Sequence, residues 1–307
     1  MSTSALYAVC ILIWGTTWYA ITAQISVVAP EVGVALRFGL AALVIGVLCH
    51  FRGIPMRFRP RVNALILVQG LSGFCASYIC VYEAERYVAS GVVAVGYAAS
   101  PLSGLVLARL VLGTRMSGRV ALGGLIGILG VLAVFWHETA HVAGSSQALW
   151  GVALTMISVL LSSVSTVATA ACQRLGVKGW GPLAQAMAWG SAGATLWALA
   201  QGTAWRWSWQ PGFLGSLVYL AVFGSVMTFG AYYALVARVG PARAGYVGVL
   251  TPLIALVVSS ALEGFAWTGL TVLGIVLAIL GNLVALWPVA APAPRVTRAP
   301  GPVRNAA

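Results

Sequence analysis

The sharpest chemical motif in the chain is formed by two histidines and a glutamate. His137, Glu138 and His141 match the H-E-x-x-H pattern of zinc proteases, in which two imidazoles one helical turn apart bind the metal and the glutamate activates water. The motif follows an apolar segment and enters a short loop where no helix is expected. His50 is expected at the opposite membrane face, so only an outer glutamate such as Glu263 could be the third ligand. We therefore expect no enzyme, no metal and no cofactor, and a membrane zinc protease is kept as a remote alternative.

Arg37 offers a different chemistry, because it is the one basic residue inside an apolar segment. A guanidinium at the centre of a span costs about 2.5 to 3.5 kcal/mol on insertion scales, so it normally faces the bundle interior or water. Its paired donors suit a substrate carboxylate. The alternative is structural, since Arg37 lies close to a span end and could reach the interface or bond backbone carbonyls there.

Aromatic and hydroxyl side chains gather on the same segments, where they would suit a cavity for amphipathic solutes. Trp14 and Trp18 are four residues apart and so share a helix face. Interfacial belts and hydroxyls that bond their own helix are the alternatives. The candidate substrate-binding residues are Trp14, Trp18, Arg37, Tyr78, Tyr97, Ser100, Tyr246 and Thr251.

The composition excludes an ordinary soluble domain. Hydrophobic residues make up 61% of the 307 residues, charged residues make up 7%, and the mean hydropathy is +0.97. The formal net charge of +12 could suggest nucleic acid, but the basic residues lie in short gaps between apolar runs. We expect a lipid bilayer and a small-molecule substrate as partners, and no nucleic acid.

Ten apolar segments have about the length that a membrane-spanning helix needs. They cover roughly 4–24, 32–50, 62–82, 87–110, 119–136, 149–172, 182–201, 213–236, 243–262 and 267–287. The fold class predicted is an all-α integral membrane protein with ten transmembrane helices. The proline-rich basic tail at 288–307 has nothing to bury, so disorder is expected there.

The basic residues predict an orientation. Of the 17, 14 fall in the gaps after even-numbered segments and in the tail, two fall on the other side, and Arg37 lies within a segment. By the positive-inside rule both termini are cytoplasmic.

An internal repeat divides the chain. Tyr82, Pro101 and Trp136 recur 151 places later as Tyr233, Pro252 and Trp287. Five spans per copy is an odd number, so the copies at 1–143 and 144–287 should form inverted repeats. Proline removes a backbone donor, so we expect helix breaks or hinges at both copies of the repeated proline.

Glycines in the fifth segment form a stripe of small residues. Gly123, Gly127 and Gly130 are spaced for close helix packing, and a homodimer through this face stays open.

Several of these motifs carry a resemblance to a known family. Ile13-Trp14-Gly15-Thr16-Thr17-Trp18, Leu36-Arg37-Phe38, and Ser100-Pro101-Leu102 followed by Leu112-Gly113 resemble EamA-type members of the drug/metabolite transporter superfamily. The resemblance implies ten helices in two inverted five-helix repeats, a central cavity, and bacterial export of amino acids, other metabolites or toxic compounds. One departure is that Thr114 and Arg115 follow this Leu-Gly, where the family often has Glu or Asp-Arg.

Together these observations predict a bacterial inner-membrane carrier that exports small amphipathic metabolites, amino acids above all, by alternating access. Multidrug and nucleotide-sugar carriers would share the architecture, although a nucleotide diphosphate would need several cavity cations and Arg37 is alone. No carboxylate lies deep in a predicted span, so a proton or sodium relay lacks an evident carrier. Facilitated exchange and uniport therefore stay open.

Overall fold

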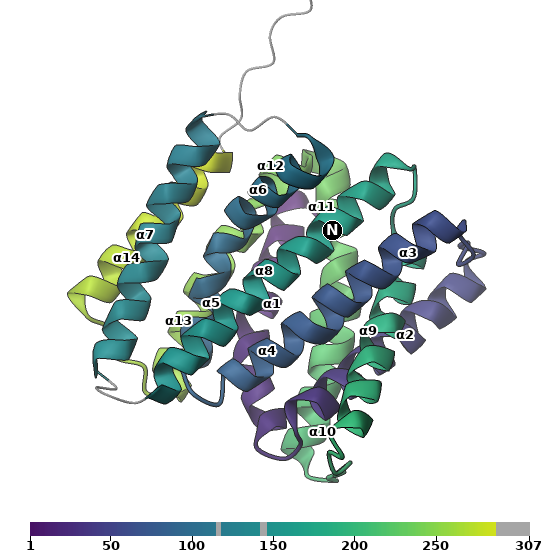
Figure 1. Ribbon diagram of the computed structural model, residues 1–307, viewed down its shortest axis with the longest axis horizontal. Helices are drawn as coiled ribbons and strands as arrows, with labels where there is room; N and C mark the ends of the chain where they lie inside the picture. The colour runs from purple at the N-terminus through teal and green to yellow at the C-terminus, as the bar shows by residue number, and fades with distance from the viewer. Residues whose placement is uncertain (115–117, 142–145, 287–307) are drawn as a thin grey trace, which may run out of the picture.

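The computed structural model describes residues 1–114, 118–141 and 146–286, with side chains throughout except at 137–141, 241, 242 and 286. Every regular element in these ranges is helical (Figure 1). The first half comprises α1 (Thr3–Ile25), α2 (Pro30–Phe51), α3 (Pro60–Gln69), η1 (Gly70–Ala76), α4 (Ser77–Ala84), α5 (Ser90–Gly96), η2 (Tyr97–Ala99), α6 (Ser100–Leu112) and α7 (Gly118–His141). The second half comprises α8 (Ser146–Arg174), α9 (Trp180–Ala200), α10 (Pro211–Val218), η3 (Tyr219–Met227), α11 (Thr228–Val239), α12 (Pro241–Ala244), α13 (Tyr246–Leu262) and α14 (Gly269–Leu286).

Local sequence explains where several helices begin and end. Pro30, Pro60 and Pro211 begin α2, α3 and α10, where the missing N–H has no helical partner to lose. The Ser2 side chain accepts a hydrogen bond from the backbone N–H of Ala5 and caps α1. Gly113 ends α6 in the left-handed conformation that glycine adopts without a Cβ clash.

Length and apolarity fit a membrane protein. In the described part of the chain, seven helices are long and apolar enough to cross a bilayer, and two shorter helices, Tyr246–Leu262 and Gly269–Ala285, are also apolar. Each of the ten segments expected from the sequence contains helix. How many of them cross the bilayer stays a prediction.

The structure corrects the expected loop at the H-E-x-x-H motif. Helix α7 continues through His141, so the motif is helical rather than part of a loop. Extending an existing helix by one turn is easier than starting a new one, and none of these residues breaks a helix. The side chains of 137–141 lie outside those described. Among the described residues, no group of three His, Cys, Asp or Glu side chains could hold a metal ion.

The two repeated prolines differ in their local structure. Pro101 lies in the first turn of α6, directly after the 3₁₀ turn η2, so the helix is irregular where the sequence predicts it. Helix α13 instead runs without interruption through Pro252, and the break expected there is absent. The Thr251 hydroxyl donates to the carbonyl of Val247 (2.8 Å), next to the Gly248 carbonyl that loses its helical donor at Pro252.

The glycine stripe packs α7 against α14 of the same chain, and the two helices lie side by side in Figure 1. A Cβ added at Gly123 would collide with the backbone of Gly281, and one added at Gly130 would collide with the backbone of Gly274. The two helices are therefore antiparallel. Moving 151 places turns the first pair of glycines into the second, so this contact is symmetric between the two halves.

Other contacts between the halves follow the same pattern. Helix α2 packs against α9, and α5 packs against α13. Reciprocally, η3 and α11 pack against α1, while η1 and α4 pack against α8. The two π-helical segments η1 and η3 occupy equivalent positions, since residues 70–76 become 221–227 after 151 places. At their closest approaches, Gly73 faces Ser165 and Gly224 faces Thr17.

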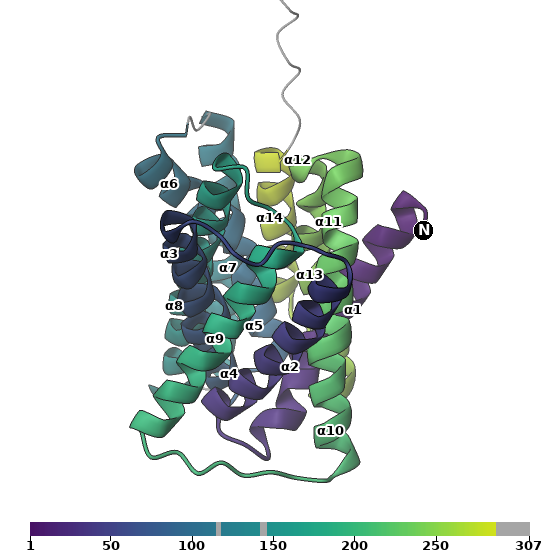
Figure 2. The same ribbon diagram turned by 90° about the vertical axis from the view of Figure 1, so that its right-hand side faces the viewer.

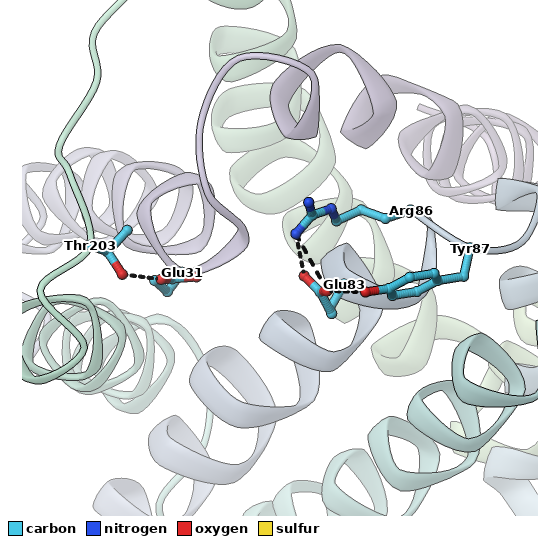
Figure 3. Close-up of polar contacts among 5 residues, drawn as sticks. All are labelled: Glu31, Glu83, Arg86, Tyr87 and Thr203. Carbon is cyan, nitrogen blue, oxygen red and sulfur yellow. Dashed lines mark hydrogen bonds and ion pairs between the residues drawn. The ribbon is translucent and has the colours of Figure 1, made fainter. Parts of the chain in front are cut away.

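The two ends of the bundle differ in charge. The acidic end, at the lower edge of Figure 2, carries Glu31, Glu83, Glu85 and Glu263. Figure 3 shows the contacts of two of these glutamates: Thr203 donates to Glu31 (2.5 Å), and Arg86 and Tyr87 both donate to Glu83 (3.0 and 2.9 Å). The opposite, basic end carries residues such as Arg61, Arg174, Lys178, Arg238 and Arg243.

Candidate functional site

Arg37 lies on the face of α2 that points into the bundle, and only 2% of the residue is exposed. Its guanidinium carbon lies 4.8 Å from the centre of the Tyr78 ring and 5.1 Å from the centre of the Phe38 ring. Both contacts are cation–π interactions, which strengthen when water is excluded. The Nε and Nη1 atoms have no hydrogen-bond partner among the described residues. A buried cation with open donors is a site for an anion.

Polar groups from neighbouring helices surround this cation. The Tyr82 hydroxyl, fully buried, donates to Gln24 Oε1 (2.9 Å), which joins α4 to α1. Tyr82, Tyr78 and Glu85 are electrostatic neighbours of the guanidinium. Gln24 Nε2 and both carboxylate oxygens of Glu85 lack hydrogen-bond partners in the described structure. We refer to these five residues, Gln24, Arg37, Tyr78, Tyr82 and Glu85, as the Arg37 cluster.

Glu85 follows the span that ends at Ala84, yet it is buried, with 8% exposed. No direct ion pair joins it to Arg37 in the described structure. Burial raises the pKa of the Glu85 carboxyl well above its ordinary value, the nearby Glu263 raises it further, and Arg37 lowers it. The carboxyl therefore keeps its proton to a higher pH than an exposed glutamate does, because an unpaired charge in such a place is costly.

A row of aromatic rings leads from the Arg37 cluster toward the basic end, between the two halves. Successive ring centres are 4.7, 5.1, 6.1, 6.4 and 6.1 Å apart along Tyr78, Phe38, Phe74, Phe229, Tyr233 and Trp180. The rings come from α4, α2, η1, α11 and α9. Phe38 is fully buried and Phe74 is 6% exposed, so the middle of the row is packed core at the contact between the halves.

The row ends at a cavity of about 320 Å³ among α3, α8, α9 and α11. Its polar lining includes Gln69, Thr169, Gln173 and Lys178, and Tyr233 belongs both to this lining and to the row of rings. The cavity lies toward the basic end. Polar and aromatic groups therefore continue from the Arg37 cluster to a hollow at the opposite end of the bundle.

Five of the predicted site residues lie in or beside this region. The rings of Trp18 and Tyr97 are 5.0 Å apart, and the Tyr97 hydroxyl lies 2.9 Å from Ser77 Oγ, next to Tyr78 in the chain. Trp14 donates its indole N–H to the carbonyl of Gly224 (3.0 Å), and its ring centre lies 5.3 Å from that of Phe229. The structure therefore brings Trp14, Trp18, Arg37, Tyr78 and Tyr97 to the contact between the halves.

The other three predicted residues have more local surroundings. Thr251 is buried and bonds its own helix. Tyr246 is an electrostatic neighbour of Tyr7, whose hydroxyl donates to the carbonyl of Arg243 at the basic end (2.7 Å). The hydroxyl of Ser100 is buried without a hydrogen-bond partner in the described structure.

Sequence reasoning missed several members of the region, and the repeat could have found two of them. Moving 151 places turns Tyr78 and Tyr82 into Phe229 and Tyr233, which are the rings of the row on α11. Glu85 gave no such signal, because it follows a predicted span and looked like an outer surface residue. Its burial depends on packing against other helices.

Comparison with known proteins assigns the sequence to a family. The sequence matches the EamA-like transporter family twice, at residues 2–136 and 149–287. The chain belongs to the EamA-like transporter family. It is 28% identical over 299 residues to the uncharacterized inner membrane transporter YedA of Escherichia coli strain K12, covering 94% of each chain. It is 25% identical over 290 residues to protein PagO of Salmonella typhimurium strain LT2, covering 93% of each.

Two more distant matches agree with the EamA-like assignment. An uncharacterized transporter of Archaeoglobus fulgidus is 23% identical over 283 residues, covering 91% of this chain and 96% of its own. A crystal structure matches with a TM-score of 0.65 at 18% identity, covering 92% of this chain and 96% of the other, which supports the fold alone. This EamA-like chain is therefore a multi-pass membrane protein of a transporter family.

Proposed function

We propose that the protein exports small amphipathic metabolites, amino acids above all, across the bacterial inner membrane by alternating access. The observation that carries the proposal is the buried Arg37 guanidinium, which has two unpartnered donors beside the contact between the halves. An α-carboxylate presents two oxygens that match such donors. The row of rings next to Arg37 suits an apolar side chain.

Alternating access requires two halves that can exchange conformations, and inverted repeats provide them. The antiparallel packing of α7 on α14 supports this arrangement. The antiparallel packing of α2 on α9 supports it too. The Ser191 hydroxyl donates to the carbonyl of Ala35 near the start of α2, and the Gln185 amide donates to the carbonyl of Met56 just beyond the end of α2. We assign residues 1–143 and 144–287 to the two halves, and 288–307 to a tail.

The acidic end of the bundle is closed and the basic end has a cavity, as expected for one state of an alternating-access cycle. Tyr82 is fully buried at the acidic end, where it bonds Gln24 and packs against Gly33. Its repeat partner Tyr233 borders the cavity toward the basic end. The excess of basic residues makes the basic end cytoplasmic, with both termini on that side. We assign this conformation to a state in which the cavity faces the cytoplasm but does not reach the Arg37 cluster.

Counterflow tests the proposal. Proteoliposomes are loaded with one unlabelled amino acid from a panel, and entry of the same labelled amino acid is followed. We expect aromatic or aliphatic amino acids to enter with the wild type and not with Arg37→Ala. Arg86→Ala is the matched control, because Arg86 is half exposed and its ion-pair partner in the described structure is Glu83. Absence of counterflow for the whole panel would move the assignment to cationic drugs or other metabolites.

A further inference from the structure

Glu85 differs from the other glutamates whose side chains the structure describes. Glu31 accepts a hydrogen bond from Thr203, Glu83 accepts bonds from Arg86 and Tyr87, and Glu263 accepts bonds from the hydroxyl and backbone N–H of Ser90. Glu85 accepts none, although it is the most buried of the four, with 8% exposed. A buried carboxylate without donors is stable only when it carries a proton or when a cation comes to it.

The groups that face Glu85 set this balance. Arg37 on α2 favours the ionised carboxylate, and Glu263 beyond the end of α13 disfavours it. Tyr82 on α4 is a further electrostatic neighbour and is neutral, and its hydroxyl is engaged by Gln24 of α1. Arg37 lies close enough to act on Glu85 but makes no ion pair with it in the described structure. Arg37 and Glu85 therefore act on each other through their charges without being joined directly in the described structure.

We propose that Glu85 is the coupling site of the transporter, where a proton and the ammonium group of the substrate bind in turn while Arg37 holds the substrate carboxylate. The inference rests on the proposed function, because it takes the substrate to be an amino acid zwitterion. Its carboxylate and ammonium groups are opposite charges a short distance apart, as Arg37 and Glu85 are. Each unpartnered atom of these two side chains then gains a partner.

The exchange conserves charge and protons at each step. When the bundle is open to the cytoplasm as far as Glu85, the carboxyl releases its proton there, and a zwitterion then takes its place without changing its own protonation. After the acidic end opens, the substrate leaves and a proton from outside binds to the carboxylate. One proton enters for each zwitterion exported, so one net positive charge moves inward. The membrane potential and the pH gradient would therefore both drive export.

A first experiment tests the proton site without substrate. Infrared difference spectra of the full-length protein in lipid vesicles are recorded while the pH is changed from acid to alkaline. We expect a protonated carboxyl band that persists at neutral pH and disappears at alkaline pH in the wild type and in Glu83→Gln. The band should be missing in Glu85→Gln. A band unchanged in Glu85→Gln, or no such band in the wild type, would overturn the assignment.

A second experiment tests coupling with phenylalanine as the probe. In inside-out vesicles the cytoplasmic face of the protein points outward, so an acidic interior supplies the proton gradient that would drive export. Accumulation of labelled phenylalanine is measured with and without this gradient. We expect the gradient to raise accumulation in the wild type and in Glu83→Gln, and to have no effect in Glu85→Gln. Wild-type counterflow that ignores the gradient would overturn coupling and leave the carrier intact. Absence of counterflow for the entire panel would instead remove the proposed function, and the infrared result would still decide the proton site.

Discussion

The guanidinium carbon of Arg37 lies 4.8 Å from the centre of the Tyr78 ring, and the nearest buried carboxyl, that of Glu85, makes no ion pair with it. A structural arginine at this depth would be expected to bond carbonyls or a carboxylate. This one rests on rings and leaves Nε and Nη1 free of protein partners in the described structure. The rings hold the cation in place while two of its nitrogens keep open donors, as a binding site requires.

The Tyr78 ring should matter for transport more than its hydroxyl. Tyr78→Leu removes the cation–π contact, and Tyr78→Phe keeps it. Since such contacts contribute about 0.5 to 2 kcal/mol, we expect a roughly 2- to 30-fold loss of apparent affinity for Leu. We expect little change for Phe. The measurement is the concentration dependence of phenylalanine counterflow, and equal behaviour of the two variants would contradict a role for the ring.

Packing of α7 on α14 should tolerate no added Cβ at Gly130. That atom would meet the backbone of Gly274 and Ala278, whereas a Cβ at Gly127 would meet nothing within 4 Å. We expect Gly130→Ala to lose about 1 to 3 kcal/mol of stability, as overpacked sites do. Gly127→Ala is the matched control and should be neutral. Thermal unfolding in detergent checks this, and equal melting temperatures would show that the helices do not pack as described.

Closure of the acidic end should depend on the Tyr82 hydroxyl, which bonds Gln24 across α4 and α1. A net hydrogen bond contributes about 1 kcal/mol, so Tyr82→Phe should shift the conformations roughly fivefold toward an open acidic end. The cavity at the basic end would then close more often, and maleimide labelling of Lys178→Cys should slow.

Tyr87→Phe is the control for this shift, because it also removes a tyrosine hydrogen bond at the acidic end, to Glu83 within the same segment. Labelling of Lys178→Cys should be unchanged in that background. If Tyr82→Phe labels at the same rate as Tyr87→Phe, the bond to Gln24 does not control the closure.

The stability of the protein should fall as the pH rises, in part because of Glu85. Its pKa is raised on folding by burial and by Glu263, so its contribution is complete below the unfolded carboxyl pKa and is lost as the pH rises through the folded pKa. Between about pH 5 and about pH 9, the melting temperature of the wild type should therefore decrease more than that of Glu85→Gln. Glu83→Gln should follow the wild type, and parallel curves for all three would refute a buried neutral Glu85.

The sequence predicted the elements well where one physical effect dominates. The lengths of the apolar segments predicted the helices to within a few residues. The free-energy cost of a charge inside a span predicted that Arg37 faces the bundle interior. The glycine spacing predicted close helix packing but not the partner, and the structure shows that α7 packs on α14 through these glycines.

Other features depended on neighbours that the sequence does not reveal. The burial of Glu85 follows from packing among several helices, and at the end of a predicted span a glutamate looks exposed. The helix through His141 follows from the continuation of α7, while the uninterrupted α13 shows that Pro252 is accommodated by its surroundings. Phe38 and Phe74 were missed because single phenylalanines in an apolar span carry no signal of their own.

Whether Arg37 binds a substrate carboxylate is tested most directly by comparing phenylalanine with phenethylamine, which lacks a carboxylate. Proteoliposomes are loaded with either compound, and counterflow of the same labelled compound is measured for the wild type, Arg37→Lys and Arg37→Ala. We expect the wild type to exchange phenylalanine and not phenethylamine, Arg37→Lys to keep part of this activity, and Arg37→Ala to lose it. Equal exchange of both compounds by the wild type, or an undiminished preference for phenylalanine in Arg37→Ala, would contradict carboxylate binding by Arg37.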